Sequence, residues 1–260
     1  MLQHEWFCDQ TEAEIARMAS LVAGADPAGP VPTCPPWSVA RLVKHTGIIH
    51  RWVTHIVTNR SSEPVSQRDV EAGLPDLETA YPGWLANGAA PLIAALRSAG
   101  PDETVWAWGA ESRSGWWARR MLHETTVHRA DAQFAVGGVP DIDPVVAADG
   151  IEEFLTNLPS ANRPRDHLGS LPEGKSLHRH ATDTDTDTDA DGDADGEWLI
   201  RFGGGTVTWS RGHEKATAAV RGPVAALLLF TYGRLEPTAE SLTVFGDSSV
   251  LDAWREKTAL

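Results

Sequence analysis

Apolar residues recur at spacings of three and four along several stretches of the first 140 residues. Such spacing is typical of an amphipathic α-helix with one buried face. The first stretch is expected to begin near Thr11, because Thr11 and Glu14 have the spacing of a capping box, and to run to about Val22. Ser38 is a candidate N-cap for a second helix over about residues 39–58. Both helices should bury one face.

Two further helical stretches follow in the same part of the chain. The pattern predicts a third helix over about residues 76–98, with Pro82 and Pro91 marking its start or a kink. A fourth helix opens at Gly115 and ends at the glycine pair 137–138. Four helices in this length of chain predict an antiparallel four-helix bundle, an architecture that builds metal and ligand sites between facing helices.

The pattern changes after residue 140. A further helix is predicted over Val145–Leu158, and then short apolar runs alternate with glycine-rich turns. The predicted elements are hairpin strands at 197–202 and 205–210, a strand at 217–222, a helix within 223–235, a strand at 241–247 and a closing helix at 249–257. The fold class is therefore α+β, with a helical bundle over residues 1–140 and a smaller α+β domain over residues 141–260.

A repeat of aspartate and threonine interrupts the second domain at about residues 181–196. It contains no large apolar residue, so we expect a disordered, solvated insertion. Part of it matches the first half of an EF-hand calcium loop, namely Asp187, Asp189, Asp191 and Gly192. The twelfth position of that loop is Trp198 instead of glutamate, which makes calcium binding a weak interpretation.

The net charge of the chain is −14, and seven of the negative charges lie in the run from Asp183 to Asp195. The remaining −7 is a mild acidity that argues against a nucleic-acid partner, because such binders carry basic patches. The longest apolar run, at 224–230, is too short to span a bilayer, and the first residues do not resemble a leader, so we expect a cytoplasmic protein. Cys8 and Cys34 are expected to be reduced thiols.

Three ionisable residues interrupt the apolar faces of two predicted helices. His45 lies in the face of the second helix, and Glu124 and His128 lie four residues apart in the face of the fourth. Burying such groups without partners costs roughly several kcal/mol, which coordination of a divalent cation would offset. Zinc is the first candidate, although the ligand types also suit nickel, iron or manganese, and three protein ligands leave one zinc position open. The spacing H-E-x-x-x-H does not match the zincin motif.

A simpler interpretation of these residues is a hydrogen-bonded histidine and glutamate pair without a metal. Arg119, Arg120, Arg129 and Asp131 are interpreted as scaffold or outer-sphere groups, with Asp131 a candidate to orient a ligand. The histidines outside the cluster are expected to be surface or packing residues, namely His4, His50, His55, His167 and His213. Two more, His178 and His180, are expected to be solvated beside the acidic insertion.

Several segments resemble the mycothiol-dependent maleylpyruvate isomerase family. They are "PPWSVARLVKHTGIIHRW" of the second helix, "WWARRMLHETTVHRADAQFAVG" of the fourth, and "DIDPVVAADGIEEFL" and "VRGPVAALLLFTYGRL" with the later "VFGD" of the second domain. The resemblance implies a DinB-like four-helix bundle that holds a divalent metal, usually zinc, through His45, Glu124 and His128. It also implies a smaller C-terminal domain that supplies a catalytic arginine, for which Arg234 is the candidate and Arg221 the second choice.

The same resemblance implies mycothiol, the low-molecular-weight thiol of actinobacteria, as cosubstrate. We therefore expect a metal-dependent isomerase or thiol S-transferase that acts on a small electrophile, because zinc stabilises a thiolate and the thiolate is the attacking species. Two alternatives stay open: a metal-dependent hydrolase of a small amide or thiol conjugate, and a non-enzymatic protein that binds a thiol or another small molecule. A purely structural module without metal is a third. The sequence carries no signal for the oligomeric state.

Overall fold

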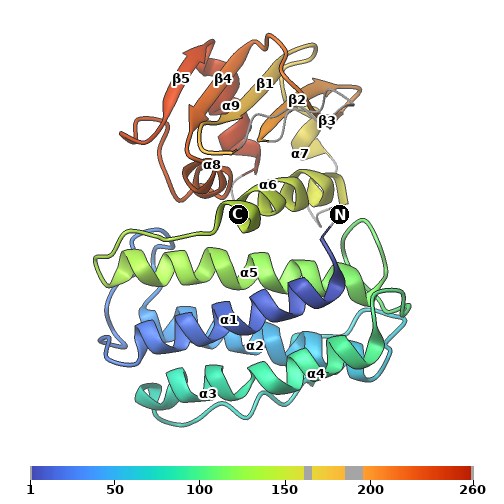
Figure 1. Cartoon of the computed structure of the whole chain (residues 1–260), viewed down its shortest axis with the longest axis vertical. Coiled ribbons are helices and arrows are strands. Elements are labelled where there is room, and N and C mark those ends of the chain that lie inside the picture. The colour runs from blue at the N-terminus through green and yellow to red at the C-terminus, as the bar shows by residue number, and fades with distance from the viewer. Residues whose placement is uncertain (1, 161–165, 185–195, 259–260) are drawn as a thin grey trace. The chain divides into compact units, whose positions relative to one another are not determined.

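The computed structural model describes residues 2–160, 166–184 and 196–258. The chain divides into two compact units, Met1–Asp141 and Ile142–Leu260. The first unit is helical and the second contains a five-stranded sheet with helices (Figure 1). The predicted fold class, a helical N-terminal region followed by an α+β region, is confirmed.

The helices of the first unit form a bundle in which α5 packs against both α1 and α2 (Figure 1). The helix α4 packs against α1 and α2 in turn. The bounds are α1 His4–Val22, α2 Val39–Thr58, α3 Tyr81–Asn87, α4 Ala89–Ala99 and α5 Ser114–Ala135, with single 3-10 turns η1 Gln67–Asp69 and η2 Glu78–Ala80. Because α5 lies between neighbours, most of its residues are buried, and polar and charged side chains are among them.

Two helix boundaries follow the sequence prediction closely. The Ser38 side chain accepts a hydrogen bond from the backbone N–H of Arg41 at 3.2 Å, so this residue caps α2 as predicted. The helix α5 stops at Ala135, and Gly137 follows with a φ of 76°. Glycine adopts this left-handed conformation without steric cost, so it ends the helix.

The predicted start of the first helix was wrong. The helix α1 begins at His4, and Thr11 lies inside it, where its hydroxyl donates to the backbone carbonyl of Phe7 at 2.7 Å. Glu14 pairs with Arg17 and with the buried Arg129 instead of capping the helix. A threonine inside a helix commonly satisfies its hydroxyl in this way, so the Thr-x-x-Glu spacing was not a helix start here.

The predicted third helix consists of two helices that meet at Gly88. Pro82 and Pro91 lie in the first turns of α3 and α4, where proline does not disrupt helical hydrogen bonds. A Cβ at Gly88 would come within 2.7 Å of the Arg51 guanidinium, which itself donates to the Trp84 carbonyl oxygen at 2.7 Å. A larger residue at the break would therefore have to displace the end of the Arg51 side chain.

The second unit begins with α6 and is built on a mixed sheet in the order β3-β2-β1-β4-β5. The strand β1 runs parallel to β4, and the other neighbours are antiparallel. The bounds are α6 Pro144–Asn157, η3 Leu158–Ser160, α7 Asp166–Gly169, β1 Ser176–Ala181, β2 Glu197–Gly203, β3 Thr206–Arg211, β4 Ala218–Gly222, α8 Val224–Thr231, β5 Thr243–Gly246 and α9 Ser248–Thr258. The predicted hairpin is β2 and β3, and the later strands and helices also lie where they were predicted.

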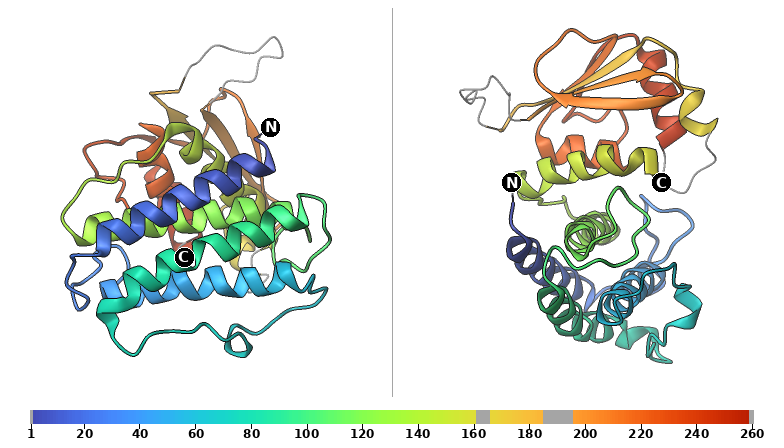
Figure 2. Two further views of the ribbon diagram at one scale, coloured as in Figure 1. Left: turned by 60° about the horizontal axis from the view of Figure 1, so that its bottom comes forward. Right: turned by 90° about the vertical axis from the view of Figure 1, so that its right-hand side faces the viewer.

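The strand β1 was not predicted, and the interpretation of His178 as solvated was wrong. Successive side chains of a strand point to opposite faces. The helices α8 and α9 cover one face of the sheet (Figure 2). Arg179 is fully buried on this face, where its guanidinium donates to Thr231 and lies over the Trp254 ring. His178 is on the other face and is buried as well, and His180 is partly exposed. The strand was missed because His178, Arg179 and His180 show no alternation of apolar and polar residues.

Two other predictions concern the acidic insertion and the membrane. Residues 185–195 lie outside the described part of the chain, and with them most of the calcium-loop match. Trp198, the residue at the twelfth loop position, is buried in β2 and donates its indole N–H to Glu152 at 3.1 Å. Among the described residues no helix combines the length and the apolar character needed to cross a membrane.

Candidate metal centre

The helices α2 and α5 bring His45, Glu124 and His128 together. The Nε2 atoms of His45 and His128 lie 3.2 Å and 3.3 Å from the same oxygen, Oε1 of Glu124. One ligand atom from each of the three residues lies within 4.8 Å of the others. Glu124 and His128 share a face of α5 because they are one helical turn apart, and α2 packs against α5 and supplies His45.

Asp131 fixes the ring of His128 from behind. His128 donates its Nδ1 hydrogen to Oδ2 of Asp131 at 2.9 Å, and the fully buried Asp131 carboxylate also accepts from Thr33 and Cys34 at 2.6 Å and 3.3 Å. A histidine whose Nδ1 donates to a carboxylate turns its Nε2 toward the ligand. The contact is compatible with the orienting role that the sequence suggested for Asp131, and this role stays a prediction.

Glu124 is held in a similar way by Arg120. The Arg120 guanidinium donates to Oε2 of Glu124 at 3.0 Å, which leaves Oε1 facing the two histidines. Burial alone would raise the pKa of Glu124, but hydrogen bonds from His128 and His45 hold it well below its usual value. Burial also disfavours protonation of His128, yet hydrogen bonds to Asp131 and Glu124 outweigh it and raise the pKa to about 9.

These donors fit a divalent cation. Two imidazole nitrogens and one carboxylate oxygen converge, which is a ligand set that zinc and related ions accept. Arg120 holds Oε2 of Glu124 and Asp131 holds Nδ1 of His128, so that Oε1 and Nε2 face the centre. Access is open on one side, because the side chains of His45 and Glu124 are 36% and 20% exposed. An ion here would have room for an exchangeable ligand.

Cys34, His128 and Asp131 form an overlapping group of possible ligands. We favour the first group, because the Asp131 carboxylate is completely buried and already accepts hydrogen bonds from three side chains. An ion bound there would have to displace these donors. The group centred on Glu124 is the one that solvent reaches.

Trp37 forms an aromatic wall beside the cluster. Its ring centroid lies 4.9 Å from that of His45 and 6.0 Å from that of His128, and the Arg41 guanidinium lies 5.0 Å from the Trp37 centroid. Trp37, Thr33 and Cys34 all belong to the proline-rich segment that precedes α2. The sequence offered no spacing by which these three residues could be assigned to the site, because the segment is irregular.

Comparison with known proteins identifies the family of the chain. The family model for the mycothiol maleylpyruvate isomerase N-terminal domain matches residues 8–133, and the model for the C-terminal domain of that family matches residues 145–253. The chain belongs to the mycothiol maleylpyruvate isomerase family. It is thus homologous to an enzyme, as the resemblance in the sequence implied. No curated protein matches the chain significantly.

Solved structures of this family have the same fold. A crystal structure of the mycothiol-dependent maleylpyruvate isomerase is 15% identical, covers 94% of this chain and 93% of its own, and superposes with a TM-score of 0.58. A histidine-to-alanine variant of the mycothiol-dependent maleylpyruvate isomerase is 14% identical, with the same coverage and a TM-score of 0.59. At these identities the likeness establishes the fold alone.

The family's C-terminal unit contains both arginines that the sequence singled out. Arg234 follows α8 and donates from its guanidinium to the Tyr232 carbonyl oxygen at 2.7 Å. Arg221 is exposed on β4, where it pairs in register with His180 of β1. Arg234 is the better held of the two, since part of it is buried.

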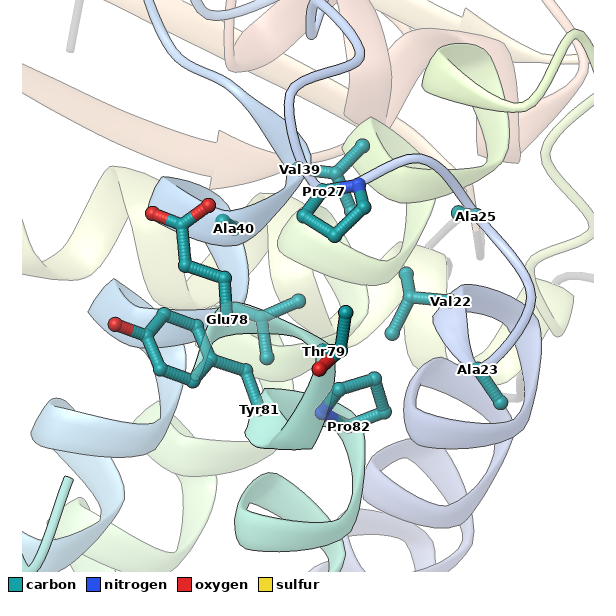
Figure 3. A pocket seen from close by; sticks show the side chains of 11 residues that line it. Val22, Ala23, Ala25, Pro27, Val39, Ala40, Glu78, Thr79, Tyr81 and Pro82 are labelled. Carbon is teal, nitrogen blue, oxygen red and sulfur yellow. The ribbon is translucent and has the colours of Figure 1, made fainter. Parts of the chain in front are cut away.

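A small pocket lies in the helical unit, separate from the cluster (Figure 3). The residues that line it are mostly apolar: Val22, Ala23, Ala25, Pro27, Val39, Ala40, Val43, Glu78, Thr79, Tyr81 and Pro82. None of the three candidate ligands is among them. Because it offers a single carboxylate and one phenol as ionisable groups, we assign it no chemistry.

Proposed function

We propose that this protein is a metal-dependent enzyme that uses mycothiol to isomerise maleylpyruvate or a related small electrophile. One observation carries the proposal: three ligand atoms of His45, Glu124 and His128 converge in a chain of this family, and buried partners orient two of them. We further propose that the cation is zinc. A divalent cation at such a site lowers the pKa of a bound thiol and so supplies the nucleophilic thiolate.

The residues of the chain have distinct tasks in this proposal. Asp131 holds the Nδ1 hydrogen of His128 and so keeps its Nε2 available as a ligand. Arg120 holds the second oxygen of Glu124, which prevents this carboxylate from rotating away from the histidines. Trp37 shields one side of the two imidazoles from water. Each of these contacts orients a ligand before any substrate binds.

The reaction class follows from thiol chemistry. A thiolate that adds to an electrophilic carbon–carbon double bond leaves a single bond, about which the molecule can rotate. Elimination of the same thiolate restores the double bond in the other geometry, so the thiol is regenerated and no oxidant is consumed. If the carbanion left by the addition takes up a proton before elimination, the product is a thioether, and the same machinery acts as an S-transferase.

We assign the substrate carboxylate to Arg234. An arginine guanidinium binds a carboxylate through two parallel hydrogen bonds, which fixes both its position and its direction. The assignment is tested by kinetics of Arg234→Lys and Arg234→Ala with Arg221→Ala as the matched control. A rise in KM in both Arg234 variants, absent in the control, supports it; unchanged kinetics of Arg234→Ala would reject it.

The proposed function is tested with full-length protein that has been stripped of metal and reloaded with zinc. Maleylpyruvate should be isomerised only when both mycothiol and metal are present, and Glu124→Gln should abolish turnover. Turnover of a thiol conjugate without added mycothiol would instead support a hydrolase. Tight binding of mycothiol without turnover of any electrophile in a panel would support a binding protein. Either of these two results rejects the proposal.

A further inference from the structure

A second group of histidines surrounds a buried carboxylate in the sheet unit. Both oxygens of Glu197 contact imidazoles: Oε2 lies 3.1 Å from His178 Nε2 and 2.7 Å from His213 Nδ1, and Oε1 lies 2.8 Å from His180 Nδ1. The three ring centroids lie between 5.4 Å and 6.1 Å apart. This arrangement shares no residue with the centre between α2 and α5.

The strand register explains how these residues meet. His178 and His180 are two apart in β1, so they point to the same face of the sheet. Glu197 is directly opposite His180 in the antiparallel pair of β1 with β2. After β3 the chain continues alongside β2, where the Gly212 N–H donates to the Glu197 carbonyl oxygen at 3.2 Å and places His213 beside the carboxylate.

The Glu197 carboxylate of this cluster is buried, so its negative charge needs compensation. The side chains of Glu197 and His178 are each only 6% exposed, whereas His213 is 73% exposed and admits solvent on one side. A buried carboxylate is costly unless it is compensated by charge or by hydrogen bonds. An imidazole in its neutral form supplies one N–H but no positive charge, whereas a bound dication would supply that charge.

We propose that His178, Glu197 and His213 form a second metal site, for zinc or a similar borderline transition-metal dication. Their ligand atoms lie within 4.8 Å of one another, as close as those of the first cluster. Two imidazole nitrogens with one carboxylate oxygen suit such ions better than calcium or magnesium, which prefer oxygen ligands. His180 holds the other oxygen of Glu197 and orients it.

The site has a structural role, because its ligands come from β1, β2 and the segment after β3. A bound ion therefore ties three segments of the sheet together and stabilises the folded unit by mass action. The seven aspartates between Asp183 and Asp195 join β1 to β2 in the sequence and raise the local concentration of cations by their charge. They are not needed as ligands in this proposal.

The experiment measures zinc bound to the tag-free, full-length His128→Ala protein, in which the first cluster has lost a ligand. We expect about one zinc ion per chain at micromolar free zinc, and a rise in Tm on zinc addition. Addition of His213→Ala or Glu197→Gln to this background should remove both. His55→Ala, a histidine of α2 outside both clusters, is the matched control and should change neither.

Two results would overturn the proposal. The first is unchanged zinc binding in the double variant His128→Ala, His213→Ala. His213 is exposed, so its replacement should leave the fold intact, and circular dichroism would verify this. The second is loss of binding when residues 185–195 are replaced by an Asn-Gly turn, which would assign the ion to the aspartates instead. Thr184 and Gly196 lie close enough for such a turn, since a Cβ at Gly196 would come within 2.0 Å of the Thr184 hydroxyl. Zinc binding that survives this replacement supports the site. The result does not depend on any enzymatic activity.

Discussion

The two histidine and glutamate clusters use the same donor types but are built differently. In the helical unit Glu124 and His128 lie on one turn of α5, and charged partners, Arg120 and Asp131, hold both from behind. In the sheet unit Glu197 takes its contacts from histidines of β1 and of the segment after β3. Charged partners orient the ligands and tune the bound ion, so the first cluster suits catalysis. Ligands from several strands connect those strands through the ion, so the second cluster suits stabilisation of the fold.

The largest effect on zinc binding is expected when the carboxylate of the first cluster is removed. Glu124→Gln should lose zinc from the centre between α2 and α5 and reduce turnover to background, because the amide is a poor ligand and donates toward the histidines. Zinc in the sheet unit should be unaffected. Metal analysis of the variant beside wild type gives the result; equal zinc content would contradict the assignment.

The next largest effect is expected at the residue behind His128. Asp131→Asn removes the charge that fixes the ring, so zinc affinity should fall by about 10–100-fold, as for other partners of metal-bound histidines. Competition titration with a chelating dye measures this change. Thr33→Val, which removes one donor to the opposite oxygen of Asp131, is the control and should cost less. Equal losses would show that the charge of Asp131 has no special role.

A smaller effect is expected at the corresponding position of the second cluster. His180→Ala frees one oxygen of Glu197 without removing a proposed ligand, so zinc affinity should fall by less than about 10-fold, because a partly exposed imidazole orients less firmly than a buried carboxylate. The measurement is made in the His128→Ala background. A loss as large as that of His213→Ala would make His180 a ligand, and the two clusters would then differ in ligand number.

The smallest effect concerns the helix that carries His45. Ser38→Ala removes the N-cap of α2 and should lower the free energy of unfolding by about 1 kcal/mol, with little change in zinc affinity. Urea unfolding of the metal-free protein measures the difference. Ser66→Ala, the cap of the single turn η1, is the control and should cost less. A large fall in zinc affinity would mean that the start of α2 moves His45.

The first cluster could be predicted from the sequence and the second could not, for a physical reason. Glu124 and His128 are four residues apart in a helix, so the helical period alone places them together, and His45 follows from the apolar face of α2. Glu197 and His213 approach His178 only through strand pairing across the acidic insertion. Local spacing carries no information on that pairing, because register is set by the whole sheet.

The fold was predictable where one face of an element is buried and the caps are regular, as at Ser38 and Gly137. It was not predictable at Thr11, whose hydroxyl bonds a carbonyl within α1, or at Gly88, where two helices meet within one predicted helix. The buried Arg179 was not predicted either, because strand β1 itself was not predicted. The burial of Arg179 depends on tertiary contacts with α8 and α9, whereas the hydrogen bond of Thr11 is local to its own helix.

The central claim, a cation held by His45, Glu124 and His128, is tested most directly by anomalous diffraction at the zinc edge from crystals of the zinc-loaded protein. The account predicts an anomalous peak about 2 Å from Nε2 of His45, Nε2 of His128 and an oxygen of Glu124. A zinc-loaded crystal with these side chains in mutual contact and no anomalous density between them would contradict it.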